Sequence, residues 1–180
     1  MAAAPITVCV PAYNAAAFIE NTLDKVSQQS HPDMRVLVSV DLSTDDTVER
    51  CRKFERDSRF RVFAHDERRD WIHNINGMID GVETDDYCML PHDDLIETDY
   101  LITLQNALDA NERAAVAFTD IVAFGDLTGA VSQPSIGGEL FDRLPFSGIY
   151  RRGSPSPATG SASAHRMEQK ELLMQAFGCI

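Results

Sequence analysis

The sequence predicts an α/β protein built around one mostly parallel β-sheet. Short runs of β-branched and other apolar residues alternate with longer segments whose apolar residues recur at helical spacing. Strands that alternate with helices are joined by right-handed crossovers, which place the strands parallel to one another. The chain has 180 residues, of which 44% are hydrophobic. This length and composition suit one domain with a packed core, and they exclude disorder over most of the chain.

The first part of the chain carries three expected strands, each followed by a helix. The strands are short apolar runs, and Pro11 closes the first of them. Asn14 suits the N-cap of the first helix, and the hydroxyls of Ser43 and Thr44 suit the start of the second. In chain order the expected elements are a strand over 6–10, a helix over 15–29, a strand over 35–40, a helix over 43–56, a strand over 60–64 and a helix over 71–82.

The second part of the chain begins with the same alternation and then loses it. A fourth strand is expected over 87–90, a helix over 98–110, a fifth strand over 115–119, a turn over 125–129 and a last helix over 164–177. Residues 132–163 are rich in Ser, Pro and Gly, which predicts a loop. We therefore divide the chain into a regular part, 1–125, and a less regular part, 126–180.

The charges are unevenly distributed. With 16 basic and 28 acidic residues the formal net charge is −12, which argues against a nucleic-acid partner. Residues 50–69 hold eight of the basic residues, whereas 70–112 hold eleven acidic residues and no Lys or Arg. The acidic stretch is either a solvated face or a source of carboxylates that bind a cation.

The cysteines and the N-terminus predict a soluble, cytoplasmic protein. The four cysteines form neither a C-x-x-C pair nor a zinc-binding spacing with histidine, so we expect reduced thiols. No run reaches the ~20 apolar residues that a membrane span needs. The first residues lack the basic region and long apolar run of a secretory signal.

Three polar segments follow expected strands and should meet at one edge of the sheet. These segments are 11–14, 41–44 and 91–94. Ligands of parallel sheets bind beyond the carboxyl ends of the strands. Asp41 could accept a hydrogen bond from a nucleobase N–H, could be a turn or cap residue, or could be phosphorylated. The last alternative expects a second Asp two residues later, where this chain has Ser43.

The adjacent carboxylates Asp93 and Asp94 indicate a binding site more specifically than Asp41 does. Two such charges about 4 Å apart, at an effective dielectric constant of about 20, repel by roughly 4 kcal/mol. They could point apart, be partly protonated, or share a cation, and hard oxygen ligands suit Mg²⁺ or Mn²⁺. Tyr13 could stack on a base or simply pack. Arg68 and Arg69 follow the third strand, where guanidinium groups could meet a diphosphate.

Four ordered motifs give the chain a more specific likeness. They are Val8-Cys9-Val10-Pro11-Ala12-Tyr13-Asn14, Val40-Asp41-Leu42-Ser43-Thr44-Asp45-Asp46-Thr47, Trp71-Ile72-His73-Asn74-Ile75-Asn76 and His92-Asp93-Asp94. Over about residues 5–125 the chain resembles the family 2 glycosyltransferases of GT-A fold. The resemblance implies a Rossmann-like, three-layer α/β/α sandwich that binds a nucleotide-diphospho-sugar.

The resemblance assigns roles to individual residues. Asp41 matches the aspartate that reads the base, Asp93 would face the ribose and the metal, and Asp94 would be the main ligand of Mg²⁺ or Mn²⁺. The nucleotide-binding residues that we expect are Pro11, Ala12, Tyr13, Asn14, Asp41, Arg69, Asn76 and Asp93. The chain departs from the family pattern at Val40, Leu42 and Pro91, which replace Asp, Gly and Asp.

The expected activity is that of a hexosyltransferase-type glycosyltransferase. It would move a sugar from a nucleotide donor, with UDP-sugar favoured, to a saccharide, lipid or protein acceptor, with metal assistance and inversion. Residues 1–125 would bind the donor, and 126–180 would be an incomplete acceptor-side part. No catalytic base is assigned, because the family places it beyond a helix like 165–178 and the sequence ends at Ile180. We therefore expect a C-terminally truncated domain. The alternatives are a non-catalytic nucleotide-sugar-binding module and an acidic interaction domain.

Overall fold

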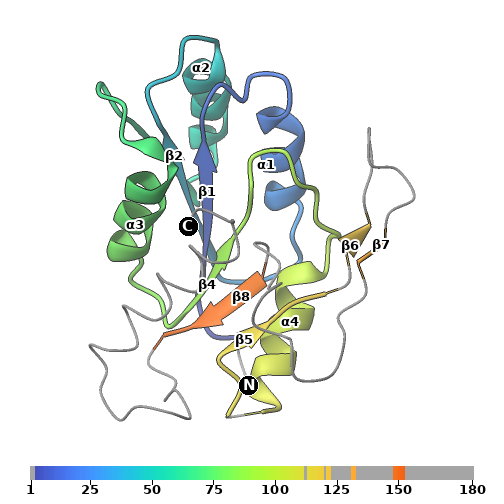
Figure 1. Ribbon diagram of the computed structural model, residues 1–180. Coiled ribbons are helices and arrows are strands. Elements are labelled where there is room, and N and C mark those ends of the chain that lie inside the picture. The colour runs from blue at the N-terminus through green and yellow to red at the C-terminus, as the bar shows by residue number, and fades with distance from the viewer. Residues whose placement is uncertain (1–2, 112, 120, 123–130, 133–147, 153–180) are drawn as a thin grey trace.

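The computed structural model describes residues 3–111, 113–119, 121–122, 131–132 and 148–152. Its elements are β1 (Ile6–Ala12), α1 (Ile19–Ser27), β2 (Met34–Val40), α2 (Thr47–Arg52), the 3-10 helix η1 (Lys53–Arg56), β3 (Phe60–Ala64), α3 (Asp70–Gly81), β4 (Asp86–Met89), α4 (Tyr100–Asp109), β5 (Val116–Ala117), β6 (Ile121–Val122), β7 (Val131–Ser132) and β8 (Gly148–Arg151). The larger sheet has six strands in the order β3-β2-β1-β4-β8-β5, and β6 pairs with β7 in a small second sheet. Helices flank the larger sheet (Figure 1).

The sheet is mostly parallel, as the sequence predicts. Strand β1 pairs in parallel with β2 on one side and with β4 on the other, and β2 pairs in parallel with β3. Strand β8 runs antiparallel to both β4 and β5. The chain thus leaves β1 toward β2 and β3 and then returns to the other side of β1 for β4. This reversal is the topological switch point, beside which α/β folds form their ligand crevice.

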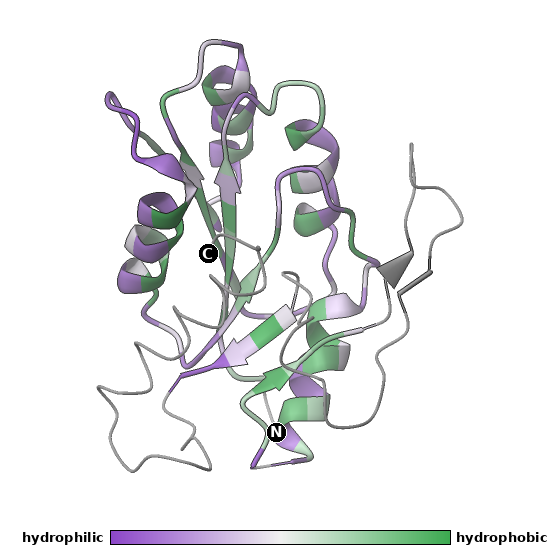
Figure 2. Ribbon diagram, viewed as in Figure 1, coloured by the Kyte–Doolittle hydropathy of each residue, from purple (hydrophilic) through white to green (hydrophobic). Residues whose placement is uncertain are grey.

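Two apolar clusters fill the spaces between the sheet and its helices. Alternate residues of β1 point to opposite faces, so Val8 packs with α1 and α4 whereas Cys9 packs with α3. The helices carry hydrophobic and hydrophilic sides accordingly (Figure 2). The predicted inner face of α4, with Leu101, Leu104 and Leu108, is buried as expected. The result is the three-layer α/β/α arrangement.

Strand β1 continues through a proline that the sequence predicts as its end. Pro11 and Ala12 lie opposite Ser39 and Val40 of β2. The carbonyl of Cys9 accepts a hydrogen bond from the N–H of Leu90, on the β4 side. The backbone nitrogen of Pro11, two residues later, faces this same side of β1. Strand β4 has already ended there, so no neighbouring strand needs a hydrogen bond from an N–H at this position. A central strand therefore tolerates the proline at this position.

The first helix begins later than predicted, and Asn14 is not its N-cap. Helix α1 begins at Ile19 with Phe18 at its N-cap. Asn14 has a φ of 45°, and its side-chain oxygen accepts a hydrogen bond from the N–H of Thr44 at 2.9 Å. The asparagine thus connects two loops. The second predicted helix is also divided, because α2 ends at Arg52 and η1 follows it.

A strand lies where the sequence predicts a loop. The prediction for 132–163 is wrong for Gly148–Arg151, which form β8 inside the larger sheet. The guanidinium group of Arg151 donates to both carboxylate oxygens of Asp86 at 2.8 Å and to Asp109 at 2.6 Å. The ring of Tyr150 stacks on Tyr87 with centroids 5.4 Å apart. These partners are distant in sequence, so a four-residue segment carries no local signal for them.

Other predictions concern the ends of elements and the cysteines. The fifth strand is shorter than predicted, and the turn over 125–129 and the helix over 164–177 lie outside the described residues. Cys9, Cys51 and Cys88 are free and buried, and burial raises the pKa of Cys88 to about 12. Among the described residues, the helices are too short or too polar to cross a membrane. The cytoplasmic location stays a prediction.

We predict that Arg151→Met lowers the free energy of unfolding by about 3–5 kcal/mol, because it leaves a buried carboxylate without its cation. The partner, Asp86, is only 1% exposed. Urea unfolding measures the change. The double variant Asp86→Asn/Arg151→Met should recover part of the loss. Asp109→Asn, at an exposed carboxylate, should cost only about 0–1 kcal/mol. Equal losses in Arg151→Met and Asp109→Asn would contradict this account.

Candidate functional site

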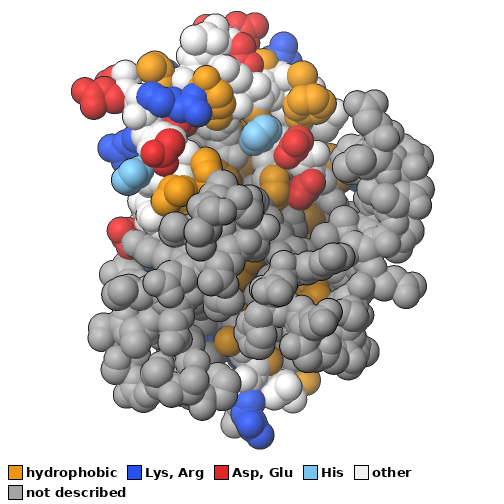
Figure 3. Space-filling view, viewed as in Figure 1, with side chains coloured by type: hydrophobic (Ala, Val, Ile, Leu, Met, Phe, Trp, Pro, Cys, Tyr) orange, Lys and Arg blue, Asp and Glu red, His pale blue; other side chains and the backbone are white. Residues whose placement is uncertain are grey.

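A cavity of about 400 Å³ opens where β1, β2 and β4 end. The space-filling view shows basic, acidic, histidine and apolar side chains gathered on this part of the molecule (Figure 3). The cavity is beside the switch point between β1 and β4, as expected for an α/β fold. The lining residues are Pro11, Ala12, Tyr13, Asp41, Arg68, Trp71, Asn74, Ile75, Pro91 and His92. The three polar segments predicted to meet at one edge thus contribute to one cavity.

Asp41 supplies a buried carboxylate to the cavity wall, with 2% of its surface exposed. Its Oδ1 accepts hydrogen bonds from the N–H groups of Leu42 at 2.9 Å and Arg69 at 2.8 Å. The Nε of Arg68 lies 2.9 Å from Oδ2, yet within the described part of the chain no aligned hydrogen bond reaches this buried oxygen. Burying an acceptor without such a bond is costly, so Oδ2 is suited to receive an N–H from a ligand.

Tyr13 and Arg68 form one side of the cavity mouth. The guanidinium carbon of Arg68 lies 3.4 Å from the centre of the Tyr13 ring, which is a cation–π geometry. Tyr13 is 40% exposed, so part of its ring remains open to solvent. The sequence predicts that both Arg68 and Arg69 could meet a diphosphate and counts Arg69 among the nucleotide-binding residues. In the structure the side chain of Arg68 lines this cavity, whereas that of Arg69 lines a separate hollow. For adjacent arginines in one loop, the sequence offers no signal that separates them.

Asn14 connects the two loops that form part of the cavity wall. Its N–H donates to the hydroxyl of Ser43 at 3.1 Å, and its side-chain oxygen accepts from Thr44 at 2.9 Å. The N–H of Ala15 donates to the hydroxyl of Thr47 at 2.7 Å. These bonds hold the loop after β1 against the loop after β2. The structure therefore places Asn14 in a role that fixes loop positions, outside the residues that line the cavity.

Asp93 and Asp94 follow the cavity wall formed by Pro91 and His92. Asp93 is exposed and Asp94 is half-buried, and the N–H of Asp94 donates to the carbonyl of Pro91 at 3.3 Å. The Nδ1 of His92 lies 3.3 Å from the carbonyl of Pro11, and the hydroxyl of Thr22 donates to the carbonyl of His92 at 2.8 Å. These bonds fix the loop after β4. Within the described ranges no three His, Cys, Asp or Glu side chains form a metal-binding cluster.

Asn74, and not the predicted Asn76, reaches the cavity. Asn74 is 3% exposed, and Asn76 is half-buried and outside the described lining. Trp71, Asn74 and Ile75 are spaced by three and four residues, so they share one face of α3. Helical periodicity could have identified Asn74, because Asn76 falls on a different face.

A hydrogen-bonded group behind the cavity includes a histidine that the sequence prediction missed. The hydroxyl of Ser39 donates to the Asn74 side-chain oxygen at 2.5 Å, and the Asn74 amide donates to the carbonyl of Ser39 at 3.0 Å. Because the single hydroxyl proton is used, the Nε2 of His65 donates to the Ser39 oxygen at 2.9 Å. Burial first, and then the charge of Arg69, lower the pKa of His65.

Residues 7–168 match the family model described as glycosyl transferase family 2. The chain belongs to this family. Among curated relatives of the family 2 domain, glycosyltransferase GlyA of Streptococcus pneumoniae is 24% identical over 139 residues, which cover 77% of this chain and 20% of GlyA. The putative teichuronic acid biosynthesis glycosyltransferase TuaG of Bacillus subtilis is 36% identical over 63 residues, which cover 34% of this chain and 25% of TuaG. The chain thus spans about a fifth of the length of GlyA.

Solved structures confirm the GT-A glycosyltransferase fold of this family 2 domain. S. aureus TarS 1–349 in complex with UDP has a TM-score of 0.67 and 20% identity, over 82% of this chain and 46% of that chain. The mannosyltransferase PcManGT of Pyrobaculum calidifontis, in complex with GDP-Man and Mn²⁺, has a TM-score of 0.65 and 20% identity. The match covers 93% of this chain and 52% of PcManGT.

We predict that stability falls as the pH is lowered through the unfolded-state pKa of histidine, about 6.5, toward the lowered pKa of folded His65. In this window the unfolded chain binds the proton first, so unfolding is favoured. Urea unfolding across the pH range, on wild type and His65→Gln, measures the effect. The glutamine retains an N–H donor for Ser39 but does not titrate, so its stability should fall less. Parallel curves for the two proteins would contradict the assignment.

Proposed function

We propose that the cavity binds the base of a sugar-nucleotide donor and that Asp41 recognises the base. The observation that supports this most strongly is the buried Oδ2 of Asp41, which has no aligned hydrogen bond in the described part of the chain and lies in the cavity wall. Uracil and guanine each present a ring N–H group that can donate a hydrogen bond to a carboxylate. Tyr13 offers an aromatic face beside it, and bases stack on such faces. A uridine donor is favoured, in keeping with the TarS neighbours that contain UDP or UDP-GlcNAc.

Asp93 and Asp94 fit a divalent cation that would accompany the diphosphate. Mg²⁺ is commonly held by one or two carboxylates, with phosphate oxygens and water as the other ligands. Two carboxylates on a fixed turn beside the cavity satisfy that requirement without a third acidic side chain. The PcManGT neighbour contains Mn²⁺ with GDP-Man. The metal, Mg²⁺ or Mn²⁺, would stabilise the negative charge that builds on the departing diphosphate.

The other described residues position the donor. The hydrogen bonds of Asn14 hold the first two loops, and those of His92 hold the third, so the base and diphosphate regions are organised before the donor arrives. Arg68 follows β3, and its side chain lines the cavity, from which it can approach phosphate oxygens. We propose sugar transfer with inversion to a saccharide, lipid or protein hydroxyl. The base that removes the acceptor proton is not assigned. Release of UDP from UDP-sugar, measured with and without acceptors, tests whether this chain catalyses transfer.

We predict that Asp41→Asn weakens UDP binding by roughly 10–100-fold, the size of a hydrogen bond to a charged group. The amide keeps an oxygen for the N–H groups of Leu42 and Arg69 and places its NH₂ where Oδ2 faces the cavity. When uracil binds, this NH₂ group and the ring N–H of uracil are both donors, and they face each other. Cytosine presents an acceptor at the same ring position, so the preference for UDP over CDP should shrink. Calorimetry with both nucleotides measures this. An unchanged ratio would contradict base recognition by Asp41.

We predict that Asp94→Ala weakens binding of UDP in Mn²⁺ and has little effect in a chelator. The reason is that the lost carboxylate acts through the metal and not through the base. The matched control is Glu97→Ala, which removes one exposed charge from the same loop. Thermal-shift titrations of UDP, with Mn²⁺ or EDTA, measure the effect. Equal binding of Asp94→Ala and wild type in Mn²⁺ would count against the metal site.

A further inference from the structure

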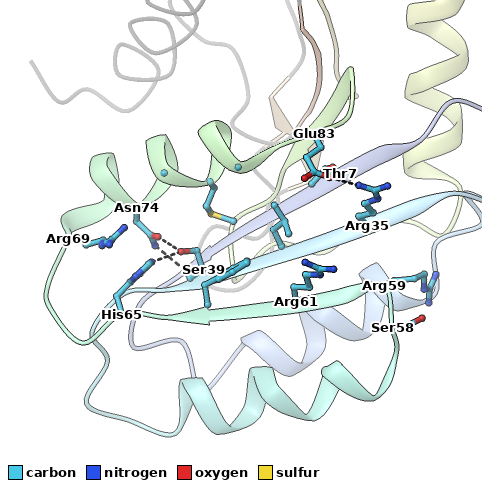
Figure 4. Close-up of a pocket in the computed structure, with 15 residues that line it drawn as sticks. Thr7, Arg35, Ser39, Ser58, Arg59, Arg61, His65, Arg69, Asn74 and Glu83 are labelled. Atoms are coloured by element: carbon cyan, nitrogen blue, oxygen red, sulfur yellow. Dashed lines mark hydrogen bonds and ion pairs between the residues drawn. The ribbon is translucent and has the colours of Figure 1, made fainter.

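A second hollow, of about 790 Å³, lies between α3 and the open face of β2 and β3 (Figure 4). Its floor includes Leu37, Phe63 and Met78. Asn74 is shared with the cavity at the strand ends, but the hollow extends along the strands to Arg35 and Ser58, near the starts of β2 and β3. We call this hollow the basic groove, and its arginines are Arg35, Arg59, Arg61 and Arg69. It is a separate surface from the proposed donor site.

Among the described elements, no helix covers the part of the sheet face that forms the groove. Parallel sheets are usually covered by helices on both faces. On this side α3 packs over β1 and β4 through Ile75, Met78 and Ile79. The outermost strand, β3, turns Val62 toward the opposite cluster and Arg61 and Phe63 toward the groove. Phe63 remains 50% exposed, so this strip presents apolar surface that another segment could bury.

The charge of the groove is opposite to that of the chain. The chain carries a formal net charge of −12, yet the groove is lined by four arginines and one acidic residue, Glu83. Glu83 pairs with Arg35 at 2.8 Å, and Asp57 pairs with Arg59 at 2.6 Å. Within the part of the chain that the structure describes, Arg61 and Arg69 form no ion pair with a carboxylate. Two guanidinium groups therefore remain available beside an apolar floor.

The free edge of β3 is less suited to binding than the face. The N–H of Val62 points out from the sheet edge and donates to the Glu55 carboxylate at 3.2 Å. A strand that joined this edge would have to displace that bond. A helix laid on the face needs no backbone hydrogen bonds from β3, and it would supply the missing part of the helical layer.

We propose that the basic groove docks an amphipathic helix of a partner protein, with apolar side chains on the floor and acidic side chains toward Arg61 and Arg69. Charge favours a partner over the segment 153–180 of this chain, because that segment carries two acidic and two basic side chains: Glu168, Glu171, Arg166 and Lys170. The inference does not depend on the proposed transferase activity, since Arg61 and Phe63, which the test below changes, line the groove and lie outside the lining of the cavity.

The test uses a labelled amphipathic peptide of about 18 residues, long enough to form a helix, with leucines on one face and glutamates flanking them. The comparison peptide carries lysine in place of each glutamate. In fluorescence anisotropy the glutamate peptide should bind at least tenfold more tightly than the lysine peptide, and more weakly as salt rises. Arg61→Glu and Phe63→Ser should each weaken binding about tenfold. Arg52→Glu, the same charge change on α2, should not.

Protein NMR with the unlabelled peptide identifies the surface that binds. Shifts should concentrate on Leu37, Phe63 and Met78, and each variant should keep the wild-type melting temperature. Failure of the glutamate peptide to bind, equal binding of the two peptides, or shifts confined to another surface would overturn the proposal. Self-association that Arg61→Glu abolishes would also overturn it, because the occupant would then be a second copy of the chain.

Discussion

The parallel pairing of β1 with β2 and β4 is the constraint on which the site depends. The register aligns Ala12 with Val40, so Tyr13 and Asp41 leave the sheet together, and the N–H of Asp41 donates to the carbonyl of Ala12 at 2.9 Å. On the other side, Cys9 is aligned with Met89, which brings the loop after β4 to the same edge. A shift of one residue in either pairing would turn the core side chains to the wrong face. Core packing therefore also fixes the position of the polar residues.

Polar contacts then convert this edge into a preorganised cavity. Two backbone N–H groups and the guanidinium of Arg68 surround the buried Asp41, and Asn14 connects the first two loops. Behind the wall, the bonds among Ser39, His65 and Asn74 attach α3 to the sheet. Such buried bonds stabilise the fold only when their partners are all present. The family 2 transferase domain thus holds its loops in position by interactions made within the protein itself.

The two hollows beside α3 are lined by side chains of different charge. The cavity at the strand ends is lined by the carboxylate of Asp41. In the groove beside β3, Arg61 and Arg69 form no ion pair with a carboxylate of the described residues, and they lie beside apolar surface. The sequence already shows a basic block followed by an acidic block, but it does not show where they lie. Arg61 and Phe63 alternate along one strand, and only the open face of the outermost strand brings them together with Arg69 of a loop.

The sequence by itself determined the family, the mostly parallel sheet and the loops that line the cavity, because apolar periodicity and strand-end motifs are local signals. It placed Asp41 and Tyr13 at this edge of the sheet for the same reason. Tertiary structure alone decided that Arg68 rather than Arg69 faces the cavity, that His65 joins the buried polar group, and that Gly148–Arg151 enter the sheet. Each of these outcomes depends on partners far away in the sequence. Arg151 is held by Asp86 and Asp109, and such long-range pairing leaves no periodic pattern in the segment that is paired.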